Sequence, residues 1–550
     1  MSKSEVKYIL AHDHGTSGSK AAIISTHGDV VGFEFQETPL YLLPNGGAEQ
    51  KPQEWWDAIM KTSKKLIDRQ LVPVEEIVAV CDTSQWSTTV PVDKDGEPLY
   101  NAISWMDTRG APYIKKLMGG PISISGYSIK HILQYFLKMG GWINITGGAP
   151  GMSGKDPIAH ILFLKHEMPD IYQKTYKFLE AKDFINLKLT GKFAASYDSI
   201  QLHWVTDIRD INNIHYNDGL IKKFKIDKEK LPPLMRAIDV VGPIKKDVAD
   251  EIGLQHDIKV VSGTPDLPSA AIGSGAVNDF EGHVYIGTSS WIICHVPYKK
   301  TDLTHNIASI PSAIPGRYFV ASEQETAGAT LSFLRDNLLY HKDELLHEEQ
   351  LSEDLLKTGV YKIFDRIAES APAGSNKLIF TPWLWGERTP IEDHFVRGGL
   401  FNISLRSTRA DLIRAILEGV AFNSRWVLQC VERFVGRQLT PLNMIGGGAN
   451  SSIWCQIFAD ILNRDIRQMK DPIQANARGA AFIAAVGLGY ITFDDIPKYI
   501  QYKKTYTPNP ENREIYDELF AEFLNIYKNN KEMYKRLNTI EKKKERRRAN

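Results

Sequence analysis

The chain has 550 residues, too many for a single hydrophobic core, and we therefore expect two large domains. Lysine and arginine together number 66, as do aspartate and glutamate, and this balance argues against a general nucleic-acid-binding protein, which is usually basic. No run of about 18 apolar residues and no apolar leader occur, and the four dispersed cysteines (Cys81, Cys294, Cys430 and Cys455) are typical of buried thiols in a reducing compartment, so we expect a cytoplasmic protein without a membrane span.

A strand–turn–strand pattern opens the chain at residues 8–25, which read Y-I-L-A-H-D-H-G-T-S-G-S-K-A-A-I-I-S. Two apolar runs flank a polar turn, as in a tight β-hairpin. The turn offers backbone N–H groups, hydroxyls and the ammonium of Lys20, which suit phosphate oxygens, whereas Asp13 offers a carboxylate that suits Mg²⁺. An ordinary surface hairpin is the alternative for this stretch on its own, because short glycine-rich turns are weak signals.

A second copy of this pattern lies near the middle of the chain. Residues 283–296 read H-V-Y-I-G-T-S-S-W-I-I-C-H-V, again with a Gly-Thr-Ser turn between two apolar strands. One such hairpin in each half predicts two similar domains, each presenting a phosphate-facing turn to a shared cleft.

The rest of the chain alternates strand and helix patterns, which indicates the α/β fold class. We expect helices at residues 53–70, 181–189, 409–435, 451–462 and 471–486, and strands at 30–36, 77–80, 90–92 and 259–262. At 443–450 a strand enters the glycine-rich turn N-M-I-G-G-G-A-N before a helix, an arrangement typical of a nucleotide cradle, with a purely structural turn as the alternative.

Two further stretches, at 147–156 and 263–276, are rich in glycine and other small residues. Residues 147–156, G-G-A-P-G-M-S-G-K-D, lack both the glycine spacing of a P-loop and the hydroxyl after Lys155, so we interpret them as a loop before a helix. Residues 263–276, G-T-P-D-L-P-S-A-A-I-G-S-G-A, contain Asp266 as their only charge, at a strand end midway along the chain. This carboxylate is a candidate for catalysis between the domains. The structural alternative, which is compatible with it, is that Asp266 is the N-cap of a helix over 269–272.

Several segments, in order, resemble the signatures of the FGGY family of carbohydrate kinases. They are D-H-G-T-S-G-S-K (13–20), S-Q-W-S-T-T (84–89), W-M-D-T-R (105–109), the segment around Asp266, I-G-T-S-S (286–290), G-E-R-T-P (386–390), L-E-G-V-A-F (417–422) and G-G-G-A-N-S-S-I-W-C-Q-I-F-A-D-I-L (446–462). The resemblance covers about residues 6–500 and, within the family, is nearest to xylulokinases. It implies an actin-like ATPase fold, in which two RNase H-like domains close over ATP and sugar. We expect an N-terminal domain at 6–275, a nucleotide-binding C-terminal domain at 276–510, and a C-terminal helix with a basic tail at 511–550.

The resemblance also implies site residues. Asp266 is expected to be the general base that takes a proton from the attacking sugar hydroxyl, and Asp13 to hold Mg²⁺. The expected ATP- and phosphate-binding residues are Gly15, Thr16, Ser17, Lys20, Gly287, Thr288, Gly328, Gly447, Gly448, Asn450 and Ser451. Those expected around the sugar are Gln85, Trp86, Ser87, Trp105 and Asp266. The implied partners are a small sugar and Mg-ATP, without nucleic acid or membrane, and the frequency of homodimers in the family predicts a homodimer.

Departures from the xylulokinase pattern leave the sugar open. This chain has Trp86-Ser87 where xylulokinases typically carry Met-His, and Leu267 where they carry Asn. Trp86 would either stack on a sugar face or simply fill space. D-xylulose, converted to D-xylulose 5-phosphate, is the expected substrate, with another ketose, a polyol or a modified sugar as alternatives. An actin- or Hsp70-like ATPase that acts on proteins, and a sugar sensor without catalysis, are the remote alternatives.

Overall fold

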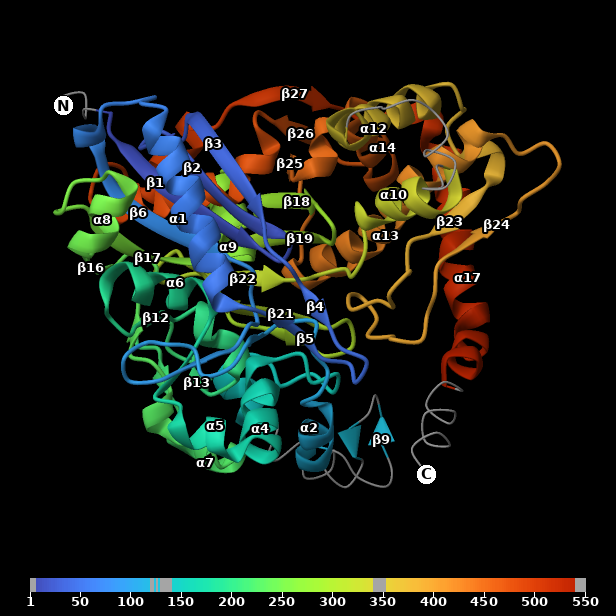
Figure 1. Cartoon of the computed structure of the whole chain (residues 1–550). Coiled ribbons are helices and arrows are strands. Elements are labelled where there is room, and N and C mark those ends of the chain that lie inside the picture. Colours follow the sequence, from blue (N-terminus) through green and yellow to red (C-terminus); the bar gives the residue numbers. More distant parts are fainter. Residues whose placement is uncertain (1–5, 119–122, 125–126, 129–140, 340–352, 540–550) are drawn as a thin grey trace.

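The computed structural model describes residues 6–118, 123–124, 127–128, 141–339 and 353–539, and Figure 1 shows the course of the chain. Its two main sheets are built from separate halves of the chain, the first from residues up to Pro265 and the second from Gly282 onward. Within the described ranges, no helix combines the length and the apolar character needed to cross a membrane. The expected basic tail at 541–550 lies outside the described residues.

The first sheet has six strands in the order β16-β17-β6-β1-β2-β3. Their bounds are β16 Val240–Pro243, β17 Lys259–Pro265, β6 Ile77–Ser84, β1 Tyr8–Gly15, β2 Gly18–Ser25 and β3 Val30–Glu37. β1, β6 and β17 run parallel, and the remaining pairs are antiparallel. Alternate residues of β1 face opposite sides, so Leu10 packs toward α1 (Pro52–Asp68), whereas Ile9 and Ala11 pack toward α15 (Ala475–Gly487).

Smaller elements surround this sheet in the N-terminal half (Figure 1). The strands are β4 Tyr41–Leu42, β5 Ala48–Gln50, β7 Val90–Val92, β8 Ala102–Ile103, β9 Ser123–Ile124, β10 Tyr127–Ser128, β11 Lys177–Leu179, β12 Ala195–Ser196, β13 Thr206–Asp207, β14 His215–Tyr216 and β15 Leu234–Met235. The helices are α2 Ala111–Met118, α4 Pro157–Glu167, α5 Pro169–Lys174, α6 Ala181–Thr190, α7 Asp218–Phe224, α8 Lys246–Ile252 and α9 Asp266–Gly273.

The second sheet has eight strands in the order β20-β21-β22-β19-β18-β25-β26-β27. Their bounds are β20 Thr301–Asp302, β21 Ile307–Pro311, β22 Tyr318–Ala321, β19 Ser290–Val296, β18 Gly282–Ile286, β25 Leu442–Ile445, β26 Ile466–Met469 and β27 Tyr502–Tyr506, and β23 Ile379–Thr381 pairs separately with β24 Gly399–Phe401. The helices are α10 Ala329–Leu334, α12 Glu353–Glu369, α13 Arg409–Val435, α14 Ser452–Leu462, α15, α16 Ile496–Tyr499 and α17 Arg513–Thr539.

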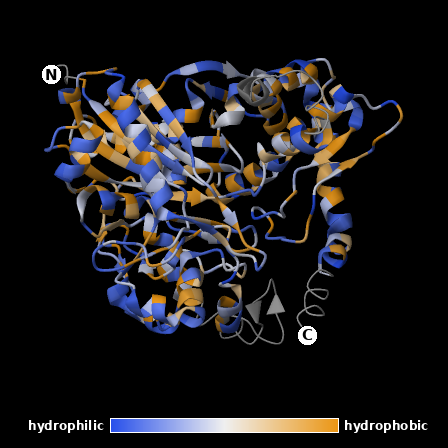
Figure 2. Cartoon of the chain, in the orientation of Figure 1, coloured by the Kyte–Doolittle hydropathy of each residue, from blue (hydrophilic) through white to orange (hydrophobic). Residues whose placement is uncertain are grey.

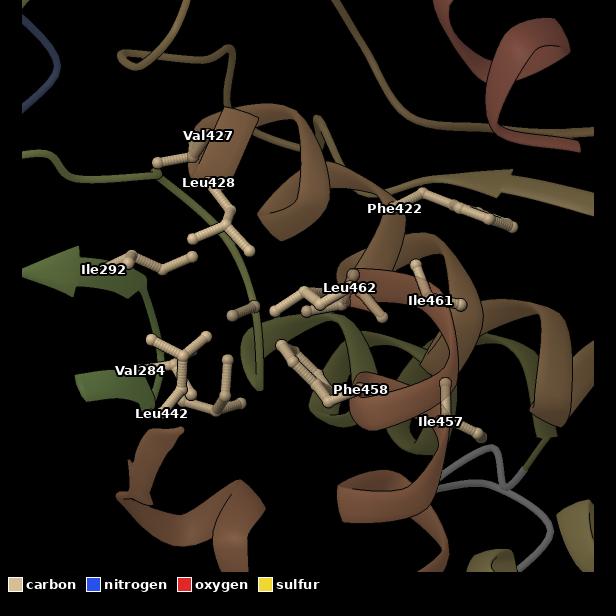
Figure 3. Packing of buried hydrophobic residues seen from close by; sticks show 14 of the residues in the cluster. Val284, Ile292, Phe422, Val427, Leu428, Leu442, Ile457, Phe458, Ile461 and Leu462 are labelled. Atoms are coloured by element: carbon tan, nitrogen blue, oxygen red, sulfur yellow. The ribbon is translucent and has the colours of Figure 1, made fainter. Parts of the chain in front are cut away.

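The core of the C-terminal half lies between this sheet and helices α13 and α14. Val284, Ile292 and Leu442 project from the sheet toward Phe458 and Leu462 of α14 (Figure 3). Hydrophobic residues run along the strands of both sheets, whereas the outer faces of the peripheral helices are largely hydrophilic (Figure 2).

Helices α9 and α15 join the two halves of the molecule. α15 lies in sequence between β26 and β27 of the second sheet, but its alanines pack on the first sheet and on α9. Two glycines permit this close approach: a Cβ on Gly273 would lie 1.8 Å from the carbonyl oxygen of Ala475, and one on Gly479 would lie 2.0 Å from that of Ser269. Because α9 begins at Asp266, this contact fixes the helix that carries the candidate base.

The structure confirms both hairpins, the alternating strands and helices, and the helix predicted over 409–435. The four cysteines are buried and free. Four predicted bounds are wrong by three or more residues: β6 continues to Ser84, β17 continues to Pro265, α15 begins at Ala475 rather than at 471, and α9 begins at Asp266 rather than at 269. Asp266 is therefore the first residue of its helix rather than the N-cap, which is Pro265.

Candidate active site

The first predicted phosphate turn is the two-residue connection between β1 and β2, at Thr16 and Ser17. The Thr16 hydroxyl is already engaged, because it donates to Oε1 of Gln85 at 2.9 Å and accepts from Nε1 of Trp105 at 2.9 Å. Ser19 is buried and hydrogen-bonded to His14 at 2.5 Å. Of the three hydroxyls that the sequence places here, that of Ser17 is the one on an exposed residue.

Asp13 and Lys20 face each other across the same hairpin. Lys20 Nζ lies 3.0 Å from Oδ2 of Asp13, and it also donates to the carbonyl oxygen of Ile473 at 3.2 Å. Ile473 belongs to the C-terminal half, so Lys20 links the two halves beside the turn. The Asp13 side chain is 12% exposed.

Asp13 also meets the requirement for a Mg²⁺ ligand. Protein-bound Mg²⁺ commonly takes one or two carboxylates and completes its shell with phosphate oxygens and water. No cluster of three or more acidic, histidine or cysteine side chains suited to a metal occurs among the described residues. A metal bound here would neutralise charge on the phosphates.

Asp266 lies where β17 passes into α9. Its Oδ1 accepts from the backbone N–H of Leu267 at 2.9 Å, which holds the carboxylate at the helix N-terminus. Burial raises the pKa of Asp266 well above its usual range, and the carboxylates of Glu323 and Asp13 raise it further. These carboxylates come from three different segments, so the fold gathers negative charge around Asp266. A raised pKa makes the ionised carboxylate a stronger base.

The second phosphate turn packs against the glycines predicted to bind the nucleotide. Gly328 donates to the carbonyl oxygen of Gly287 at 2.7 Å, and Ala327 donates to that of Thr288 at 2.8 Å. A Cβ on Gly448 would lie 2.5 Å from the side chain of Ile286, whereas one on Gly447 would meet nothing within 4 Å. The fold therefore brings these predicted nucleotide residues together, with Gly447 facing open space.

Asn450 and Ser451 end this glycine-rich turn. Asn450 is exposed. Ser451 instead caps α14: its hydroxyl accepts from the N–H of Trp454 at 3.1 Å and donates to Asp365 at 2.7 Å. The Ser451 hydroxyl thus has structural partners on two helices, α12 and α14.

The predicted sugar residues line the same region with different degrees of exposure. Gln85 donates to Oε1 of Gln50 at 2.6 Å, and Gln50 donates to the carbonyl oxygen of Thr16 at 3.0 Å, so the sugar turn and the phosphate turn form one network. Ser87, with φ of 61°, donates to the carbonyl oxygen of Lys155 at 2.8 Å. Trp105 remains partly accessible.

Trp86 is buried, as are its neighbours Gln85 and Ser87. It is 7% exposed, and its Nε1 donates to the carbonyl oxygen of Ser199 at 2.9 Å. It shares an apolar cluster with Leu267, Trp291 and Phe319. This placement favours the space-filling role for Trp86 over stacking on a sugar. Trp86 and Leu267, which both depart from the xylulokinase pattern, pack in the same apolar cluster.

Two cations that sequence reasoning left without a role lie beside Trp105, and two glutamates pair with them. Lys155 pairs with Glu325 at 3.3 Å, and Arg388 pairs with Glu325 at 3.2 Å and with Glu323. Lys155 and Arg388 lie 5.9 and 5.8 Å from the centre of the Trp105 ring. The G-E-R-T-P segment contained a signal for Arg388, but its partners come from distant segments and carry no motif of their own.

These three ion pairs join two cations to two carboxylates. Although burial acts to raise the pKa of Glu325, the charges of Arg388 and Lys155 lower it to about 2. Burial lowers the pKa of Lys155, whose side chain is 14% exposed. Lys155 belongs to the N-terminal half and Glu325 to the C-terminal half, so this pair connects the two halves.

Comparison with known proteins agrees with this arrangement. The model of the N-terminal domain of the FGGY family of carbohydrate kinases matches residues 8–141 and 143–273, and that of the C-terminal domain matches 282–488. The chain belongs to the FGGY family of carbohydrate kinases. It is therefore an ATP-dependent sugar kinase with the actin-like ATPase fold, as the sequence motifs predicted.

Individual relatives differ in the sugar that their names give. The xylulose kinase of Staphylococcus epidermidis is 28% identical over 544 residues, which cover 97% of this chain and 99% of that protein. The gluconate kinase of Lactobacillus acidophilus has a structure with a TM-score of 0.80 at 26% identity, covering 97% of this chain and all (100%) of the other. The ligand-bound xylulose kinase of the same organism also gives a TM-score of 0.80 at 26% identity, covering 96% and 100%. The family is thus established, and the sugar is a separate question.

Proposed function

We propose that this FGGY kinase transfers the γ-phosphoryl group of ATP to a hydroxyl of D-xylulose, forming D-xylulose 5-phosphate. The sugar hydroxyl attacks the γ-phosphorus, the new O–P bond forms while the bond to the ADP oxygen breaks, and the hydroxyl proton passes to Asp266. The raised pKa of Asp266 supports this role. In the same proposal Asp13 holds Mg²⁺, and the backbone around Gly15–Ser17 and Gly287–Thr288 positions the phosphates.

The observation that carries the choice of a neutral sugar is the charge balance beside Trp105. Among the described residues, Lys155 and Arg388 are cations near this ring, and each is already paired with Glu325 or Glu323. A substrate carboxylate would have to compete with these glutamates, whereas sugar hydroxyls can donate to the carboxylates and accept from the cations. A balanced set of charged groups therefore favours a neutral ketose over an aldonate.

A sugar acid is the second candidate, because a structural neighbour at 26% identity is named gluconate kinase. The two candidates make opposite predictions for Glu325→Gln. This substitution removes the carboxylate that neutralises Lys155, so it should weaken kcat/KM for D-xylulose and raise the relative activity on D-gluconate.

The experiment measures ADP release with Mg-ATP and either D-xylulose or D-gluconate, for the parent and for Glu325→Gln. Glu432→Gln is a matched control, because it also breaks a glutamate–arginine pair, with Arg464 at 2.6 Å, and lies outside the candidate site. The proposal holds if the parent has the higher kcat/KM on D-xylulose and only Glu325→Gln shifts the ratio toward D-gluconate. A parent that prefers D-gluconate would replace the ketose with the sugar acid.

The expected homodimer, the cytoplasmic location and the domain boundaries at 275/276 and 510/511 remain predictions. A division near residue 275 is supported by the two main sheets, because all strands of the first lie before residue 266 and all strands of the second begin at Gly282 or later. Gel filtration with light scattering would test the dimer directly.

A further inference from the structure

Tyr285 stands beside the second phosphate turn without an assigned role. It lies on β18, two residues before Gly287, and its ring folds against that glycine: a Cβ on Gly287 would lie 2.3 Å from the phenol oxygen. Any residue larger than glycine at 287 would therefore collide with Tyr285. The phenol oxygen is thus placed at the backbone of the turn itself.

Trp291 fixes the ring in this position. The two residues are cross-strand partners in the β18–β19 hairpin, and their rings are stacked with centroids 3.8 Å apart and planes at 6°. Trp291 is in turn held by a hydrogen bond from its Nε1 to Nε2 of His283 at 3.0 Å. Stacking on a buried, hydrogen-bonded tryptophan restricts the tyrosine to one orientation.

The same face of the hairpin packs against α9, whose first residue is Asp266. Tyr285 borders the apolar cluster that contains Ala270, Ala271 and Trp291, and it remains partly accessible. Burial, together with the charges of Asp13 and Asp266, raises the pKa of Tyr285, so the phenol keeps its proton at neutral pH. Among the described residues, the phenol oxygen has no hydrogen-bond partner. A protonated donor is therefore available between the phosphate turn and the two carboxylates.

We propose that the Tyr285 hydroxyl donates a hydrogen bond to a non-bridging oxygen of the γ-phosphoryl group during transfer. This inference rests on the proposed function, in which Asp266 receives the proton of the sugar hydroxyl and ADP departs. Tyr285 exchanges no proton in the step: the O–P bond to the sugar forms, the O–P bond to ADP breaks, and the phenol O–H stabilises charge on the phosphoryl oxygens.

The test is Tyr285→Phe, which keeps the ring, the stacking on Trp291 and the contact with Gly287. Tyr318→Phe is the matched control, because it removes a phenol in the same sheet that donates to the carbonyl oxygen of Ile208 at 2.9 Å, outside the candidate site. We expect Tyr285→Phe to lower kcat at least tenfold, and up to the ~10²–10³-fold seen when one such donor is removed, with KM for ATP changed less than about threefold. Tyr318→Phe should keep kcat within about twofold of the parent.

Steady-state ADP release with Mg-ATP and D-xylulose gives kcat and both KM values, and thermal melting reports on folding. A kcat of Tyr285→Phe within twofold of the parent would overturn the inference, as would a change confined to the KM for sugar. If the parent phosphorylates no sugar, the proposed function fails separately, and the same comparison on its hydrolysis of Mg-ATP by water still decides the role of Tyr285.

Discussion

The contact between α9 and α15 allows a sharp test of how Asp266 is positioned. In Gly479→Ala, the new Cβ would lie 2.0 Å from the carbonyl oxygen of Ser269, whereas ordinary van der Waals contact begins at 3.4 Å. The two helices would have to separate by about 1.4 Å, because the obstacle is backbone and cannot rotate away. Ser269 lies three residues after Asp266 on α9, so the base would move with the helix.

Two opposing terms set the size of the effect. Alanine is favoured over glycine in a helix by about 1 kcal/mol, whereas overpacking a tight interface costs about 1–3 kcal/mol and backbone contacts lie at the upper end. We therefore expect a net loss of about 1–2 kcal/mol of stability. A shift of about 1 Å in a catalytic group can reduce turnover by ~10²-fold, so kcat should fall by between one and two orders of magnitude.

The assay combines thermal melting with ADP release on D-xylulose. Gly141→Ala is the control, because a Cβ there meets nothing within 4 Å, and it should leave both stability and kcat near the parent values or raise stability slightly. A Gly479→Ala variant with the melting temperature and kcat of the parent would show that this contact does not position Asp266.

Two further predictions concern stability. Glu387 is buried, which raises its pKa to about 8, so the folded state keeps a proton that the unfolded chain loses in the ordinary carboxyl range, and stability should fall as pH rises through about 8. Glu387→Gln cannot titrate, so its melting temperature, followed by scanning fluorimetry, should fall less than that of the parent between about pH 6 and 9; parallel curves would contradict this. Ser451→Ala removes the cap of α14 and should cost about 0.5–2 kcal/mol of stability with little change in KM for ATP. A tenfold rise in that KM without a change in melting temperature would instead favour direct nucleotide contact.

Local signals explain which elements the sequence could predict. The helix predicted over 409–435 has the predicted bounds, and both of its ends carry local signals: Thr408 and Asp411 form a capping box, and Gly436 ends the helix in the left-handed region. The strand at 77–80 was predicted too short because Asp82 breaks the apolar pattern. In the fold, Asp82 pairs with His12 at 2.6 Å, so a charged residue is accommodated inside a buried strand.

In the candidate site, too, local patterns were visible in the sequence but long-range contacts were not. The turns and Asp266 have local patterns, and the fold brings them together. The pairing of Lys155 with Glu325 joins residues 170 positions apart, and no periodicity or motif announces it. The engagement of the Thr16 hydroxyl by Trp105 is likewise tertiary, since 89 positions separate the two residues. Sequence patterns thus predicted the turns of the candidate site, but not which of their polar groups are already hydrogen-bonded within the protein.

The most direct test of the central claim is sugar-dependent ADP release with Mg-ATP, run for the parent and for Asp266→Asn. The asparagine can still accept the hydrogen bond from the Leu267 N–H, so the variant should remain folded. We expect D-xylulose to stimulate turnover by the parent and Asp266→Asn to lower kcat by at least about 100-fold, the usual scale for loss of a general base. A folded Asp266→Asn variant with the kcat of the parent, or a parent whose ATP turnover no sugar raises, would contradict it.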